Sequence, residues 1–243
     1  MFFLVRHLML MWLLRCANNI LVPLKPMCTI SIEGFTKKIK IRQKILLRRF
    51  KIDGQPNFIE DVHSIYTVKG SKAFQGFEIN KTLFEGKSEY QDVSIYENDS
   101  LGRILTLDGI IQITECDEFV YQEMMTHVPI FSHENPKNVL IIGGGDGGIL
   151  REALRHKGIK RVVMSEIDQL VVDVCIEYMP SINNHGKVYN DPRTQLIVGD
   201  AFSFVKDTDL KFDVAIIDST DPIGPGEKLF SGEFYKNLIE ILN

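Results

Sequence analysis

The sequence has few cysteines and no long hydrophobic run, and both absences narrow the class of protein. Its four cysteines, among 243 residues, are far apart, without a Cys-x-x-Cys pair or a histidine at metal-ligand spacing. Scattered thiols favour a reducing compartment such as the cytoplasm over a disulfide framework. The apolar segment 1–14 is interrupted by Arg6 and His7 and is shorter than the ~20 apolar residues that span a bilayer. We therefore expect no transmembrane span.

The whole chain also lacks a strong excess of one charge sign, and its net charge is only −4. This small value arises because a basic N-terminal part and an acidic remainder nearly cancel. Residues 1–51 carry a net charge of +10, whereas residues 52–243 carry −14. The acidic body disfavours a nucleic-acid groove and favours a cationic partner. The basic amphipathic stretch 37–51 suits an anionic membrane surface or an organelle address. We favour a poorly ordered, solvated extension over residues 1–70 and leave the other roles open.

Residues 71–134 are predicted to form a small antiparallel β domain followed by a helix. The pair Asp108-Gly109 between two apolar runs is a strong hairpin signal, because glycine accepts the positive φ of a tight turn. Helical spacing over residues 117–128 predicts a helix that Pro129 ends. The β-type runs are residues 77–84, 92–97, 103–107 and 110–114.

From residue 135 onward, strand-type and helix-type segments alternate. This order predicts an α/β fold, with a Rossmann-like doubly wound parallel sheet. Four strands make a small sheet, and the apolar strand 212–217 would lie at an uncovered edge, which favours aggregation. We therefore expect that part of this domain is missing and that the chain is a fragment or a faulty gene model. The expected strands are 139–142, 161–164, 195–198 and 212–217, and the expected helices are 149–156, 169–178, 201–205 and 231–242.

The glycine-rich segment Gly143–Gly148 fits the pattern G-x-G-x-x-G between a strand and a helix. Its glycines let the backbone approach a ligand, and the helix N-terminus offers free N–H groups. Nicotinamide, flavin and S-adenosyl ligands share this fingerprint. Asp146 inside the loop would repel a pyrophosphate but suits an ammonium group. Its alternative role is to cap the following helix.

Acidic residues follow each predicted strand of the second domain. The carboxyl ends of parallel strands meet at one edge of the sheet, where ligands bind. Glu166, 23 residues after Gly143, is placed to accept hydrogen bonds from ribose hydroxyls. Like charges in a cleft cost stability unless a cation offsets them, so we expect a nucleoside together with amines. The acidic residues are Asp146, Glu166, Asp200, Asp218 and Asp221.

Several motifs closely resemble the spermidine synthase family of aminopropyltransferases. In the second domain they are residues 141–148 (IIGGGDGG), 165–168 (SEID) and 218–225 (DSTDPIGP). In the first domain they are residues 88–92 (SEYQD), 107–112 (LDGIIQ) and 117–124 (DEFVYQEM). The resemblance runs from about residue 74 to residue 243, with the motifs in the family's order.

The resemblance implies a methyltransferase-like Rossmann fold, a homodimer, and transfer of an aminopropyl group from decarboxylated S-adenosylmethionine to putrescine. The products would be spermidine and methylthioadenosine, and neither a metal nor another cofactor would take part. Asp218 would be the catalytic carboxylate. The implied donor site is Gln91, Gln122, Asp146, Glu166, Asp200 and Ala201, beside the loop residues Gly143, Gly145 and Gly148; the implied putrescine site is Tyr121, Asp218 and Asp221.

The chain also departs from the family pattern. Ser165 stands where the family often has cysteine, and Thr220 where serine is commoner. The family's last strands and a further putrescine-contacting tyrosine would lie beyond Asn243. Spermine synthase, putrescine N-methyltransferase and a non-catalytic scaffold or dimer partner therefore stay open as alternatives, whereas Asp146 disfavours a nicotinamide dehydrogenase.

Overall fold

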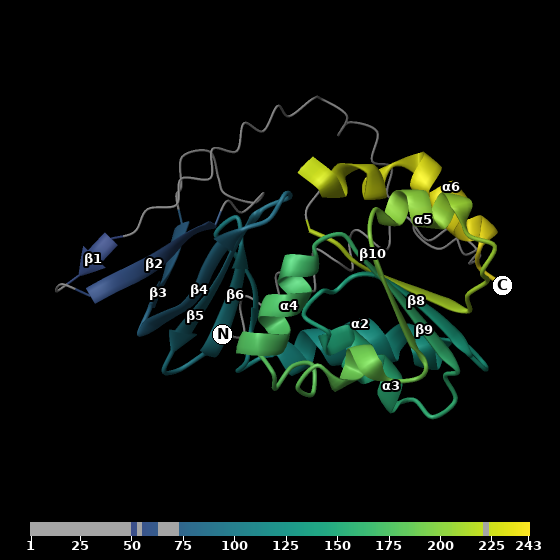
Figure 1. Cartoon of the computed structure of the whole chain (residues 1–243), viewed down its shortest axis with the longest axis horizontal. Helices are drawn as coiled ribbons and strands as arrows, with labels where there is room; N and C mark the ends of the chain where they lie inside the picture. The colour runs from purple at the N-terminus through teal and green to yellow at the C-terminus, as the bar shows by residue number, and fades with distance from the viewer. Residues whose placement is uncertain (1–49, 53–54, 63–72, 221–223) are drawn as a thin grey trace, which may run out of the picture. The chain divides into compact units, whose positions relative to one another are not determined.

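The computed structural model describes residues 50–52, 55–62, 73–220 and 224–243, and its strands belong to three sheets (Figure 1). The first sheet is antiparallel, with the order β1-β2-β3. β1 and β2 lie within residues 1–70, for which the sequence favours a poorly ordered extension, and that assignment stays a prediction. β1 pairs with β2, and β2 pairs with β3; the local sequence does not reveal these partners. The bounds are β1 (Phe50–Ile52), β2 (Gln55–Val62) and β3 (Ala73–Glu78).

The second sheet is an antiparallel meander in chain order. The predicted hairpin at Asp108-Gly109 is confirmed, and both turn residues have positive φ values, 49° and 75°. The predicted single run 77–84 is wrong, because a turn at Asn80 divides it between two sheets. The amide oxygen of Asn80 accepts the backbone N–H of Asp99 at 2.9 Å. The strands are β4 (Lys81–Lys87), β5 (Asp92–Asn98), β6 (Gly102–Leu107) and β7 (Ile110–Thr114).

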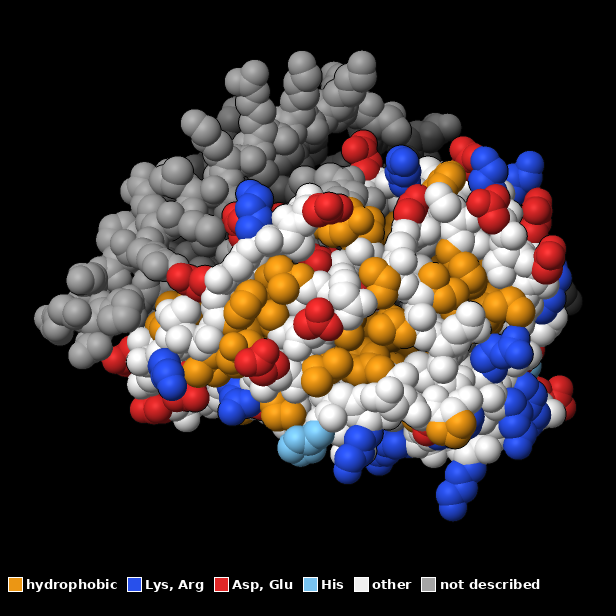
Figure 2. Space-filling model, in the orientation of Figure 1, with side chains coloured by type: hydrophobic (Ala, Val, Ile, Leu, Met, Phe, Trp, Pro, Cys, Tyr) orange, Lys and Arg blue, Asp and Glu red, His pale blue; other side chains and the backbone are white. Residues whose placement is uncertain are grey.

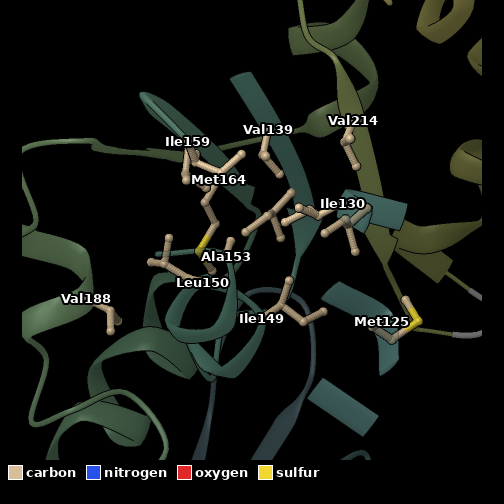
Figure 3. Packing of buried hydrophobic residues seen from close by; sticks show 13 residues of the cluster. Met125, Ile130, Val139, Ile149, Leu150, Ala153, Ile159, Met164, Val188 and Val214 are labelled. Atoms are coloured by element: carbon tan, nitrogen blue, oxygen red, sulfur yellow. The ribbon is translucent and has the colours of Figure 1, made fainter. Parts of the chain in front are cut away.

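Helix α2 (Glu118–Ser132) continues past Pro129, contrary to the predicted end. Proline lacks an N–H and costs one hydrogen bond of the helix. The last turn is nevertheless packed, because Ile130 on the far side of the proline is 3% exposed and lies near Val139 and Val214 of the sheet (Figure 3). No helix in the described part of the chain has the length and hydropathy needed to cross a membrane.

The third sheet is parallel, with the order β10-β9-β8-β11. Helices cover both faces: α2 and α3 share a core with one face, and α5 and α6 share a core with the other. The predicted α/β fold is confirmed. β11 lies beside β8, opposite β9, so the strand order reverses between β8 and β11, where such sheets bind ligands. The elements are β8 (Asn138–Gly143), α3 (Gly148–Arg155), β9 (Arg161–Glu166), α4 (Gln169–Tyr178), η1 (Lys187–Asn190), β10 (Thr194–Val198), α5 (Ala201–Asp207), β11 (Val214–Asp218), η2 (Gly224–Phe230) and α6 (Gly232–Glu240).

Helix α4 joins the parallel sheet's domain to the meander. Val93 and Ile95 of β5 are fully buried in one cluster with Val174 and Cys175 of α4. The guanidinium of Arg103 also donates to a backbone carbonyl at the end of α4. The meander and α4 therefore share a hydrophobic core, and this contact brings the β4–β5 turn onto the parallel domain. The domain boundary expected at residue 135 stays a prediction.

The surface carries charges of both signs. On the face shown in Figure 2, hydrophobic side chains run across the middle of the described residues, with acidic side chains among them. Lys and Arg side chains lie mainly toward the lower right of this view. This face therefore has no electrostatic field of one sign that would identify a partner. The buried polar groups indicate the function better than this surface does.

Candidate active site

The glycine loop lies at the point where β8 and β11 end side by side. Gly143 is paired with Asp218 across the two strands and has a φ of 79°. A β-carbon at Gly143 would collide with the backbone carbonyl oxygen of Asp218. Only glycine permits this approach, so the loop turns directly over the end of β11.

Three of the five predicted acidic residues meet at this loop. A β-carbon at Gly144 would lie 3.5 Å from Oδ2 of Asp218, and one at Gly145 would lie 2.9 Å from Oε2 of Glu166. The third residue, Asp146, belongs to the loop itself. The ends of β8, β9 and β11 thus bring their carboxylates together, as the parallel order predicts.

The negative charges of these three carboxylates are not offset by positively charged side chains among the described residues. Burial raises the pKa of Asp146 to about 7, and the charge of Asp218 adds to the shift. Burial also raises the pKa of Glu166 to about 7, and it raises the pKa of Asp218. The ion pairs among the described residues include none of the three. A bound cation would relieve the cost of ionising them.

Two adjacent residues of α2 contact the loop acids. The hydroxyl of Tyr121 donates to Oδ1 of Asp218 at 2.5 Å. Burial, and then the charge of Asp218, raise the pKa of Tyr121, so the phenol stays a donor. The amide nitrogen of Gln122 donates to Oδ1 of Asp146 at 3.0 Å. Gln122 is fully buried, and its amide oxygen has no hydrogen-bond partner among the described residues. An unpaired buried acceptor suits a ligand that brings a donor.

Asp146 also fulfils the alternative role suggested by its sequence position. Its Oδ1 accepts the backbone N–H of Gly148, the first residue of α3, at 2.7 Å. A carboxylate has about four acceptor positions. The contact with the helix therefore does not exhaust what Asp146 can bind.

Gln91 and Glu166 are joined through Asp168, which the sequence analysis left without a role. The amide nitrogen of Gln91 donates to Oδ2 of Asp168 at 2.9 Å. The backbone N–H of Asp168 donates to Oε1 of Glu166 at 2.9 Å. Asp168 lies directly before α4 and caps it, but its contact with Gln91, 77 residues away, has no local signal.

Asp200 lies beyond the end of β10 and differs from the loop acids. It is exposed, and its carboxylate caps α5 by accepting from the backbone N–H of Phe202 at 3.1 Å and the hydroxyl of Ser203 at 2.8 Å. Ala201 is buried, in the core beneath α5. Asp221, the fifth acidic residue, lies outside the described residues.

Two further residues hold the loop from the side and were missed. The hydroxyl of Tyr189 in η1 donates to the carbonyl of Gly145 at 2.8 Å. The amide nitrogen of Asn183 donates to the carbonyls of Asp146 at 3.3 Å and Cys175 at 2.9 Å. No spacing or motif indicates these contacts, because they depend on the path of the chain after α4.

A second polar cluster lies between α2 and α3. Ligand atoms of Glu123, His127 and Glu152 lie within 4.8 Å of one another, a set that could hold a metal ion. However, Nε of Arg151 and Nη1 of Arg155 already contact the two oxygens of Glu152, at 2.8 Å and 2.6 Å. The arginines supply the positive charge that a metal would bring, so we interpret this cluster as an ion-pair network.

Comparisons with known proteins match two consecutive parts of the chain, the one with the antiparallel meander and the one with the parallel sheet. The model of the spermine/spermidine synthase domain matches residues 118–243, and that of the spermidine synthase tetramerisation domain matches residues 67–115. Proteins named polyamine aminopropyltransferase from Pectobacterium atrosepticum and Yersinia pestis are each 52% identical over 169 residues, which is 70% of this chain. The match covers 58% and 56% of those proteins, so the chain spans less than two thirds of their length.

Solved structures resemble this one in fold as well as sequence. A crystal structure of spermidine synthase in complex with the transition state analogue AdoDATO has a TM-score of 0.69 and 37% identity, covering 84% of this chain and 65% of that one. Spermidine synthase from Thermotoga maritima has a TM-score of 0.68 and 36% identity, covering 84% and 64%. Because a family model matches more than half of its residues, this chain belongs to the spermine/spermidine synthase family.

Proposed function

We propose that this chain is a spermidine synthase, which transfers an aminopropyl group from decarboxylated S-adenosylmethionine to putrescine. The observation that carries the proposal is a group of three carboxylates with raised pKa values, the buried Glu166 and the half-buried Asp146 and Asp218. None of them has a basic partner among the described residues. They surround a glycine loop at the point where the strand order reverses. A nucleoside with a cationic tail and a cationic acceptor would compensate the charges that the protein leaves unpaired.

The donor would lie along the glycine loop. Asp146 would hold its propylammonium group, and the unpaired amide oxygen of the buried Gln122 would accept a second N–H from it. Glu166 would accept from the ribose hydroxyls. We assign Gln91 to the donor as well, and Asp200 with Ala201 to the adenine.

In the transfer step, the neutral amine of putrescine attacks the methylene carbon beside the sulfonium. A C–N bond forms, the C–S bond breaks and its electron pair returns to sulfur, giving methylthioadenosine. Asp218 takes the proton that the new ammonium loses, and its raised pKa makes it a better base than an ordinary aspartate. The hydroxyl of Tyr121 would orient this carboxylate. Alignment of amine and carbon can contribute ~7–11 kcal/mol.

The remaining assignments stay predictions. Asp221 would bind the distal ammonium of putrescine, with Tyr121 beside it. The cytoplasmic location and the homodimer follow from cysteine usage and from the family resemblance. None of them is needed for the test of the reaction.

The test is product analysis with the full chain. Incubation with decarboxylated S-adenosylmethionine and putrescine is expected to yield methylthioadenosine and spermidine by mass spectrometry. Replacing the donor by intact S-adenosylmethionine tests the methyltransferase alternative, and replacing putrescine by spermidine tests spermine synthase. If no donor and acceptor pair reacts and calorimetry detects no nucleoside binding, the scaffold role is favoured and the proposal fails.

A further inference from the structure

The β4–β5 turn is anchored on a single carboxylate of the parallel-sheet domain. Oδ2 of Asp168 accepts the hydroxyl of Ser88 at 2.7 Å and the amide nitrogen of Gln91 at 2.9 Å. The Ser88 hydroxyl oxygen also accepts the backbone N–H groups of Tyr90 at 3.0 Å and Gln91 at 3.1 Å. The turn is thus held by its own serine, and the serine is held by Asp168.

The other groups of Asp168 serve its own domain. Oδ1 accepts the backbone N–H of Leu170 at 3.1 Å and so caps α4. Its backbone N–H donates to Oε1 of Glu166, which leaves Oε2 of Glu166 on the side of Gly145. Asp168 is 2% exposed, so its contacts are shielded from water and strengthened by the low local dielectric.

These contacts exceed what a structural role requires. A helix cap needs one side-chain oxygen, and the apolar core around Val93 and Val174 already joins the meander to α4. The second oxygen of Asp168 is used instead to hold Gln91. With its nitrogen bound there, the amide of Gln91 presents its oxygen as the end that can accept from a ligand.

We infer that Asp168 is a positioning residue for the donor site, which orients Gln91 and Glu166 together toward the nucleoside. The antiparallel meander then takes part in donor recognition through its hydrogen bonds to the parallel domain. The inference rests on the proposed function, and it predicts an effect on the donor but not on the amine acceptor.

Asp168→Asn in the full chain tests this directly. Asparagine caps helices about as well as aspartate, so α4 should persist while one of the two acceptor oxygens becomes a donor. We expect the Kd for methylthioadenosine and the KM for the donor to rise about tenfold, the loss of one charge-assisted hydrogen bond. The KM for putrescine should not change. Ser88→Ala, which leaves the cap intact, should give the same pattern at about threefold.

Val174→Ala is the matched control, because it weakens the same contact between α4 and the meander without touching the hydrogen bonds. It should lower the melting temperature and leave the Kd for methylthioadenosine within about twofold. If Asp168→Asn and Ser88→Ala also change only the melting temperature, Asp168 is structural and the inference fails while the proposed function stands. If Asp168→Asn does not fold, Ser88→Ala decides by the same criterion. If the unaltered chain binds no methylthioadenosine, both proposals fail.

Discussion

Two groups of buried and half-buried acidic residues in this protein behave in opposite ways. Between α2 and α3, Glu152 is contacted by Arg151 and Arg155. Burial favours its neutral form, but the hydrogen bonds from the two arginines outweigh burial and hold the pKa of Glu152 below its ordinary value. At the glycine loop, no cation among the described residues offsets the burial of Asp146 and Glu166, and their pKa values rise to about 7.

The difference teaches how to separate a structural acid from one prepared for a ligand. A carboxylate whose charge is offset within the fold contributes to stability, and removal of either partner leaves the other unpaired. A carboxylate without such a partner costs stability until a cation arrives. Burial is common to both groups, so the counter-charge is what distinguishes them.

The largest expected effect is on catalysis at the uncompensated group. Asp218→Asn keeps the size of the side chain but cannot accept the amine proton, so turnover should fall by about 10²–10⁴-fold. Methylthioadenosine affinity should stay within about twofold, because Asp218 is assigned to the acceptor. Product formation and calorimetry measure the two quantities. Undiminished turnover would remove Asp218 from the mechanism.

The next largest effect is expected on the free energy of unfolding, measured for a variant of each group by urea denaturation at about pH 8. Glu152→Gln removes the charge of a buried carboxylate that accepts from Arg151 and Arg155 and should lower the free energy of unfolding by about 2 kcal/mol. Asp146→Asn removes an uncompensated charge and keeps an oxygen for the N–H of Gly148, so it should be neutral or raise that free energy by about 1 kcal/mol. Equal destabilisation by both variants would contradict the distinction.

The two groups should also give opposite slopes of stability with pH. Asp146 and Glu166 have folded-state pKa values of about 7, above the unfolded values of ~4. The folded chain therefore binds more protons in this interval, and its stability should fall as the pH rises from about 4 to about 7. Glu152, with its lowered pKa, stabilises above its unfolded pKa and loses that contribution as the pH falls further.

Melting temperatures across this range measure these slopes. The combined variant Asp146→Asn with Glu166→Gln should flatten the decline between about pH 4 and pH 7, whereas Glu152→Gln should leave that decline in place. A decline that persists unchanged in the combined variant would assign it to other groups.

The smallest effect is expected at Tyr121, whose hydroxyl contacts Asp218 while the side chain is 40% exposed. Tyr121→Phe removes one hydrogen bond to a carboxylate and should lower turnover about tenfold. The free energy of unfolding should change by less than about 0.5 kcal/mol. A loss as large as that of Asp218→Asn would mean that Tyr121 does more than orient the carboxylate.

Much of the fold follows from local sequence patterns. The Asp108-Gly109 hairpin depends on two adjacent residues, and the alternation of strands and helices depends on short-range periodicity. Local patterns misplaced the end of α2, because Pro129 opposes the helix while the core contact of Ile130 stabilises it. They also missed β2, whose hydrogen bonds come from β3.

For the site, the sequence alone determined which acids could meet, because parallel strands bring their carboxyl ends to one edge and glycines admit a close approach. Only the tertiary structure decided which of them do meet, placing Glu166 and Asp218 at the loop and using Asp200 as a helix cap. It also decided that Asp168 holds Gln91. The reason is physical: burial, counter-charge and the direction of a hydrogen bond depend on neighbours that are distant in the chain.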